Sequence, residues 1–158
     1  MPKLDPIRVL TDQHRVLTQL FARHQEALLA RAWARAARLL DQYEKHLRSR
    51  ILVEEQYLLP YCLEGRLPGQ WSVYVAEHRR LEKMLHDAGE RLRAVRRRGM
   101  SPAIIIGLLD DEKTMKYVLE HHLDSEDSEF STSLQRMLPE GVRNNLLRAL
   151  IDMARVTH

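Results

Sequence analysis

Residues 6–28 read PIRVLTDQHRVLTQLFARHQEAL, and the spacing of the apolar side chains in this stretch predicts an amphipathic helix. Apolar residues and two histidines recur at intervals of three or four on one helix face, namely Ile7, Leu10, His14, Leu17, Phe21, His24 and Leu28. Asp5 precedes the stretch as a candidate N-cap, and Pro6 suits the first helical position. A row of this length favours a helix bundle, in which neighbouring helices bury such rows against one another.

Three later segments repeat the same spacing. Their rows are Ala36, Leu40, Tyr43, Leu47, Arg50, Glu54, Tyr57 and Tyr61; then Tyr74, His78, Leu81, Leu85, Ala88, Leu92 and Val95; then Ile104, Leu108, Asp111, Met115, Val118 and His122. Glycine and proline at 68–69 and 99–102 separate the later rows, but no breaker separates the first two. An uninterrupted helix over residues 6–62 would be about 85 Å long, too long for a compact domain. A turn is therefore predicted near Leu29–Trp33.

The pattern predicts an all-α fold. Strand signals are missing from the sequence, because no alternation of period two is sustained and no Asn-Gly or Asp-Gly pair occurs. Pro139 and Gly141 punctuate the chain once more before a final amphipathic stretch that ends near Val156. We expect an up-down-up-down four-helix bundle with a short C-terminal fifth helix, forming a single domain over residues 1–158.

Composition narrows the class of protein. Six glycines and six prolines among 158 residues, with 44% hydrophobic and 30% charged residues, exclude collagenous, low-complexity and disordered chains. The single cysteine, Cys62, excludes a disulfide scaffold and a thiolate metal cluster, and favours a reducing compartment. No apolar run approaches the ~20 residues of a membrane span, and the start lacks the apolar region of a signal peptide. We therefore expect a cytoplasmic protein that does not bind membranes.

The charge pattern gives little reason to expect a nucleic-acid partner. The formal net charge is only +3, and the arginines at 91–98 fit the solvated end of a helix, where cations also suit the helix dipole. No P-loop, Gly-rich dinucleotide fingerprint or His-Glu-x-x-His motif occurs in the sequence. We therefore do not expect nucleic-acid binding, and no motif indicates an enzyme.

Ionisable side chains occupy positions of these rows that ought to be apolar. Three pairs share a spacing of four residues, which places both members on one helix face: Arg50 and Glu54, His78 and Glu82, and His122 and Glu126. In an up-down bundle, His14, Glu54, His78 and His122 fall at one level, about 9–15 Å from the same end. Such a mixture of imidazoles and carboxylates suits iron, manganese or zinc. The sequence predicts a metal centre formed by His14, Glu54, His78, Glu82, His122 and Glu126.

Four short motifs around these residues resemble those of the hemerythrin-like, or HHE cation-binding, family. They are DQHRVL at 12–17, EEQYLLP at 54–60, EHRRLE at 77–82 and HHLDSED at 121–127, in the family's order. The resemblance covers most of residues 5–135. It implies a non-haem, usually di-iron, carboxylate-bridged centre that binds O₂ or handles or senses NO or peroxide. The ligand positions that it implies are His14, Glu54, His78, His122 and Glu126, with Glu82 as a second ligand from the third helix.

The sequence departs from this family at Arg50. Members carry a histidine there, four residues before the first glutamate, whereas arginine stays protonated and has no lone pair for a metal. His46, one helical turn earlier, is an alternative nitrogen ligand. We expect one bound ion rather than two, and replacing Arg50 by histidine should raise the occupancy. The alternative is a metal-depleted structural or interaction bundle, in which Arg50 forms salt bridges with the former ligand carboxylates.

Overall fold

The computed structural model describes residues 4–60 and 68–156, with side chains except at 68–71, 126–137 and 156. Within these ranges the chain is helical and contains no strand. Five α-helices and one π-helical segment follow one another as α1 (Pro6–Leu29), α2 (Trp33–Val53), η1 (Glu54–Leu58), α4 (Pro68–Arg96), α5 (Pro102–Met137) and α6 (Glu140–Val156). The predicted all-α fold with a short C-terminal helix is therefore confirmed. Cys62 and Tyr61 lie outside the described residues.

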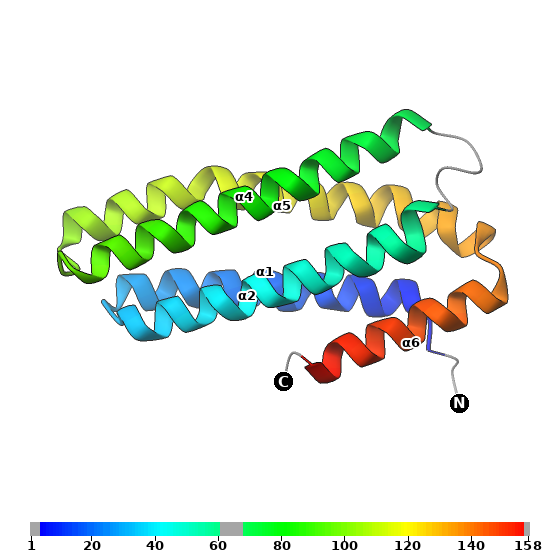
Figure 1. Ribbon diagram of the computed structural model, residues 1–158, viewed down its shortest axis with the longest axis horizontal. Helices are drawn as coiled ribbons and strands as arrows, with labels where there is room; N and C mark the ends of the chain where they lie inside the picture. The colour runs from blue at the N-terminus through cyan, green and yellow to red at the C-terminus, as the bar shows by residue number, and fades with distance from the viewer. Residues whose placement is uncertain (1–3, 61–67, 157–158) are drawn as a thin grey trace.

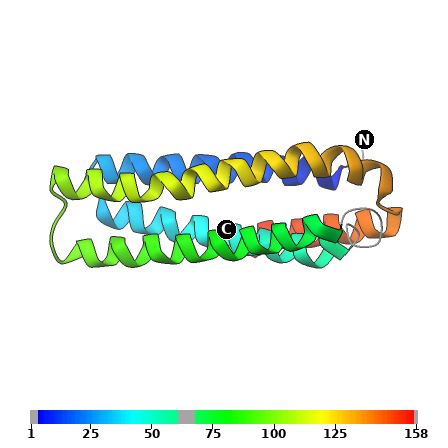
Figure 2. The same cartoon turned by 90° about the horizontal axis from the view of Figure 1, so that it is seen from above.

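The four long helices close around one core. Contacts join α1 to α2, α2 to α4, α4 to α5, and α5 back to α1. Figures 1 and 2 show α1 and α2 as one antiparallel pair facing the pair of α4 and α5. Helix α6 returns from the end of α5 and packs against α1, α2 and η1. No helix of the described ranges combines the length and apolar character needed to cross a bilayer.

Local chemistry explains where the helices begin and end. The Asp5 side chain accepts a hydrogen bond from Ile7 N at 3.1 Å, which confirms the predicted N-cap of α1. At the other end, Arg31 N donates to Leu28 O and Ala32 N donates to the carbonyl of residue 27, each at 2.9 Å. This pair of bonds is the Schellman motif, and it ends α1 inside the predicted turn near Leu29–Trp33. Arg31 takes the left-handed position at φ 56°, where glycine is the usual residue.

Most described positions of the predicted core rows are buried, but the buried row of α5 is displaced by one residue at Ile105, Glu112 and Leu119, which replace the predicted Ile104, Asp111 and Val118. Asp111 is exposed, and Glu112, which is 5% exposed, faces inward in its place. Both residues satisfy the three-to-four spacing from Leu108, so the spacing cannot choose between them. The choice falls to Glu112 because its Oε1 lies 2.6 Å from Nε2 of the fully buried His24. The other ring nitrogen of His24 donates to Ala36 O at 2.8 Å, so both nitrogens of this buried ring have polar partners.

The buried side chains form two clusters along the bundle. The larger fills the space between α1, α2, α4 and α5 and includes Tyr43, which is 1% exposed. Burial raises the pKa of Tyr43 above its ordinary value, and its hydroxyl has no hydrogen-bond partner among the described residues. The smaller cluster seals α6 against the bundle with Ile7, Leu10, Val53, Leu58, Leu138, Leu146, Leu150 and Met153.

Candidate metal centre

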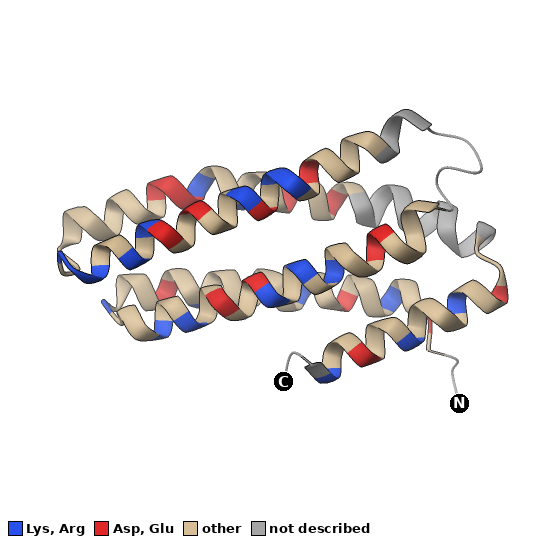
Figure 3. Cartoon of the chain, in the orientation of Figure 1, with Lys and Arg blue, Asp and Glu red and all other residues tan. Residues whose placement is uncertain are grey.

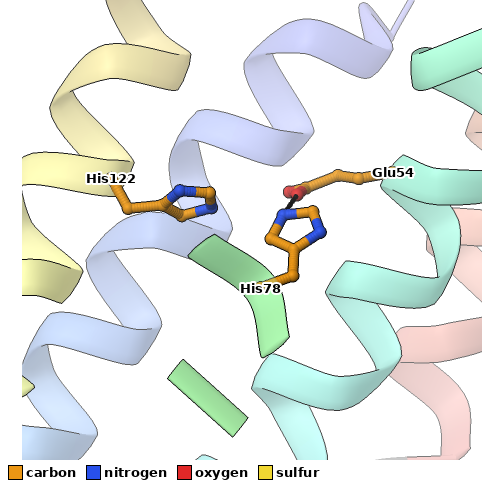
Figure 4. Close-up of side chains that lie close together, drawn as sticks. All are labelled: Glu54, His78 and His122. Carbon is orange, nitrogen blue, oxygen red and sulfur yellow. Dashed lines mark ion pairs between the residues drawn. The ribbon is translucent and has the colours of Figure 1, made fainter. Parts of the chain in front are cut away.

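Three of the six predicted metal-ligand side chains meet inside the bundle. Glu54, His78 and His122 each offer one ligand atom, and these atoms all lie within 4.8 Å of one another. The three residues come from η1, α4 and α5 and are 4%, 1% and 2% exposed. Figure 4 shows their side chains directed toward a common point between the helices. This is a set of two imidazoles and one carboxylate shielded from water.

The ring of His78 is oriented by two carboxylates. Its Nδ1 lies 3.0 Å from Oε1 of Glu55, and its Nε2 lies 3.2 Å from Oε2 of Glu54. An ionised carboxylate can only accept, so Nδ1 donates to Glu55; in the neutral tautomer with this proton the lone pair is on Nε2, where a metal ion would replace the proton that Nε2 can otherwise donate to Glu54. That nitrogen faces Glu54, as a metal ligand at this point would require.

His122 is held in the same way by a different carboxylate. Its Nδ1 lies 2.7 Å from Oε2 of Glu77, which leaves Nε2 as the nitrogen with a lone pair. The rings of His78 and His122 meet edge to face at 4.9 Å, and Tyr74 lies against His122 at 5.9 Å. Metal-bound histidines commonly donate their second ring N–H to a carboxylate, which fixes the tautomer and orientation of the ring. Both histidines already have this arrangement.

The two orienting carboxylates were missed by the sequence reasoning. Glu55 directly follows Glu54, and Glu77 directly precedes His78, so both lie inside the quoted motifs. Neighbouring positions on a helix point about 100° apart. Helical periodicity alone therefore predicts that Glu55 and Glu77 point away from the face that carries Glu54 and His78. Each carboxylate reaches across to a histidine of the next helix instead. The available signal was a glutamate directly beside a predicted ligand, namely Glu55 after Glu54 and Glu77 before His78.

Arg50 occupies the interior next to this set. It is 3% exposed, and its Nε forms an ion pair with Oε1 of Glu54. One of its terminal nitrogens donates to Leu10 O at 2.8 Å, which anchors the guanidinium to α1. The carboxylate of Glu54 is therefore shared, with Oε1 toward Arg50 and Oε2 toward His78. The positive charge of Arg50, in contact with Oε1 of Glu54, opposes the binding of a second cation on that side of the carboxylate.

The carboxylate of the site begins an unusual helical turn. Leu59 N donates to Glu54 O, an i to i+5 bond, and the π-helical segment extends over Glu54–Leu58. Such wide turns inside a helix are rare and occur frequently at functional sites. Glu54 and Leu58, the first and last residues of η1, are both buried. The π-helical segment therefore directs these two side chains into the interior of the bundle.

The remaining predicted ligands lie elsewhere or beyond description. His14 is 6% exposed on α1 but is not part of the group within 4.8 Å. Glu82 is only partly buried and accepts a hydrogen bond from Arg79 at 2.8 Å. His46 is partly exposed, and the side chain of Glu126 lies outside the described residues. Metal ligation by His14, Glu82 and Glu126 stays a prediction.

Arg79 connects Glu82 to the site indirectly. The same guanidinium that binds Glu82 also donates to Oε2 of Glu55 at 2.9 Å. The hydrogen bond that Arg79 donates to Glu82, followed by the charge of Glu55, raises the pKa of Arg79. Glu55 orients His78 and accepts hydrogen bonds from Arg79, which also binds Glu82. Arg79 and Glu82 are therefore linked to the histidine through Glu55.

Comparison with known proteins points to one family. A sequence model of the Hemerythrin HHE cation binding domain matches residues 5–134. No curated protein and no solved structure gives a significant match to the chain. The matched span contains the helices that carry Glu54, His78 and His122.

Proposed function

The chain belongs to the Hemerythrin HHE cation binding domain family, and we propose that it binds one iron ion at Glu54, His78 and His122. The observation that carries this proposal is the pairing of each ring Nδ1 with a carboxylate. This pairing leaves Nε2 of both histidines as the possible metal-binding nitrogen, on the side of the rings where an oxygen of Glu54 lies. Together with the nearby oxygen of Glu54, the two Nε2 atoms give three donor atoms within 4.8 Å of one another, close enough to hold one cation.

The donor set favours iron over the other candidate metals. Two imidazoles and one carboxylate with open positions are typical of non-haem Fe(II), although zinc and manganese accept similar ligands. An iron ion held by three protein ligands supplies open coordination positions for a diatomic molecule. We propose O₂ or NO, with peroxide as a further candidate, and reversible binding or sensing as the role. The single cysteine in the sequence is typical of a reducing compartment, and we propose that the protein acts in the cytoplasm.

The chain's own residues limit the centre to one ion. Arg50 already supplies a positive charge to Oε1 of Glu54, where a bridging carboxylate would meet a second metal. Because arginine stays protonated, it cannot take the place of the missing imidazole. Oε2 of Glu54 remains beside His78, so one cation can be bound without displacing Arg50.

Metal content tests this proposal directly. We would grow cells in iron-supplemented medium, purify the protein without chelators and measure metals by mass spectrometry. We expect about one iron per chain in the wild type, occupancy rising toward two in Arg50→His, and loss of iron in His122→Ala. Anaerobic addition of NO should then change the visible spectrum of the iron protein. Wild-type protein that carries only trace metal after this treatment would refute iron binding.

One observation favours a second function, that of a metal-free structural or interaction bundle. The ion pair of Arg50 and Glu54 neutralises the buried carboxylate without any metal. Melting in Fe²⁺, Zn²⁺ and EDTA separates the two functions, because a ligand that binds only the native state raises its stability. An unchanged melting temperature under all three conditions would support the metal-free bundle.

A further inference from the structure

A second candidate binding site lies at the other end of the bundle, where the α1–α2 turn meets the α4–α5 turn. A cavity of about 340 Å³ is lined there by Arg31, Trp33, Val95, Arg96, Gly99 and Met100. Along α4, Arg96 is separated from His78 by about 27 Å at 1.5 Å per residue. This cavity, which we call the turn pocket, is therefore independent of the candidate metal centre. Its volume is at the lower end of the range for small-molecule sites.

The turn pocket carries positive charge that the protein does not neutralise. Arg31 and Arg96 are both exposed, and neither forms an ion pair with a carboxylate of the described residues. By contrast, Arg91, earlier on α4, pairs with Asp111 at 3.5 Å. Figure 3 shows Lys and Arg gathered at both turns on this end of the molecule. Two unpaired guanidinium groups beside one cavity favour an anionic ligand.

The walls of the turn pocket are flat, apolar and fixed in orientation. Trp33 Nε1 donates to Leu92 O at 2.8 Å, and the guanidinium of Arg96 lies 4.9 Å from the centre of the indole ring. These two contacts hold the indole in place and hold a cation over its face. Val95 and Met100, both partly buried, complete an apolar lining. A ligand that matches this lining has an apolar body as well as a negative charge.

The backbone at Arg31 gives independent support for a role of its side chain. Arg31 stands at φ 56° in the Schellman turn, and this conformation is unfavourable for residues other than glycine. Glycine would end α1 with less strain but would remove one of the two cations that line the cavity. Backbone strain persists only where the surrounding structure holds it, as the Schellman bonds do here, and it is found frequently at functional positions.

We propose that the turn pocket binds a small organic anion that joins a flat apolar body to a carboxylate group. The carboxylate pairs with Arg31 and Arg96, and the apolar body lies against Trp33 and Met100. The pairing is charge-assisted, and a guanidinium can hold both carboxylate oxygens at once. The proposal does not depend on metal binding at the other end of the bundle.

A chemical-shift titration tests the turn pocket. The chain has two tryptophans, Trp33 and Trp71, so a Trp71→Phe variant assigns the indole N–H signal of Trp33. We would titrate ¹⁵N-labelled full-length protein with 2-naphthoate and, as a neutral control of the same shape, with 2-naphthalenemethanol. Saturable shifts of the Trp33 signal are expected with the carboxylate, at an affinity at least tenfold higher than with the alcohol.

Matched variants separate this site from general positive charge. Arg31→Gly and Arg96→Gln should each weaken 2-naphthoate binding at least tenfold, whereas Arg98→Gln, which removes an equal charge outside the lining, should change it less than twofold. Arg31→Gly should leave the melting temperature unchanged or raised, which shows that the loss is not due to unfolding. Equal binding of the alcohol, equal weakening by Arg98→Gln, or no shift at millimolar 2-naphthoate would each overturn the proposal.

Discussion

Removal of the Arg50 guanidinium should strongly destabilise the metal-free protein. Arg50 and Glu54 are 3% and 4% exposed, so an Arg50→Met substitution leaves a carboxylate in the interior without its charged partner. The hydrogen bond from Arg50 to Leu10 O is lost as well. Loss of one member of a buried ion pair typically lowers the free energy of unfolding by about 3–5 kcal/mol. For a domain of this size, this corresponds to a fall in melting temperature of about 6–20 °C.

A double-mutant cycle assigns this loss to the buried charge. In Arg50→Met combined with Glu54→Gln, no uncompensated carboxylate remains, so the double variant should be more stable than the sum of the single effects predicts. For two contacting residues, the expected coupling is about 0.5–3 kcal/mol. The measurement is urea unfolding of the four proteins in EDTA, followed by circular dichroism. Additive effects, or an Arg50→Met variant within about 1 kcal/mol of the wild type, would refute the reasoning, since both fall outside the magnitudes typical of buried pairs.

Addition of metal to the same four proteins extends the test. A cation at Oε2 of Glu54 compensates the carboxylate in the absence of the guanidinium, so metal should stabilise Arg50→Met more than the wild type. At a free metal concentration one hundred times the dissociation constant, binding contributes about 2.7 kcal/mol. Equal stabilisation of the two proteins would show that Arg50 does not oppose the cation.

Three further predictions follow from single contacts. Glu77→Gln should weaken metal binding about 10–100-fold by isothermal titration, because a site histidine loses its acceptor, whereas the matched Glu90→Gln, at an exposed position of the same helix, should have little effect. Burial raises the pKa of Tyr43 above its ordinary 10.0, so the stability from its neutral form is fully present below pH 10 and declines at higher pH; Tyr43→Phe should flatten this decline in melts between about pH 8 and 11. Glu112→Leu should lower the free energy of unfolding by about 1–3 kcal/mol in urea, because His24 Nε2 loses its partner; an unchanged midpoint would contradict the contact.

Helical periodicity was sufficient to predict that the three residues of the candidate centre turn inward. Glu54, His78 and His122 stand in rows of apolar residues, and a residue in such a row shares the buried face whatever its chemistry. The turn after Leu29 was predictable from length alone, although Arg31 carries no glycine or proline signal.

The contacts across helices could not be obtained from the same pattern. Whether Glu55 or Glu77 reaches a histidine depends on how far one helix is rotated about its axis relative to its neighbour. A single sequence contains no direct measure of that rotation. The choice of Glu112 over Asp111 has the same origin, because the buried partner His24 belongs to another helix. Glu82 shares the general side of His78, yet a nearby arginine is enough to hold it at the edge of the interface.

The π-helical segment η1 follows α2 directly and divides this long helix into two parts. The rotation of each part about the helix axis can be set independently of the other. Before the wide turn, the helix presents Arg50 toward the bundle interior, and the last residue of the turn, Leu58, belongs to the cluster that seals α6. A turn that spans one residue more than an α-turn absorbs an insertion without rotating the rest of the helix. Loss of the exposed Gln56 would restore a regular ladder and leave both parts facing as before. Loss of one residue near the carboxylate can therefore be absorbed without disturbing the docking of the last helix.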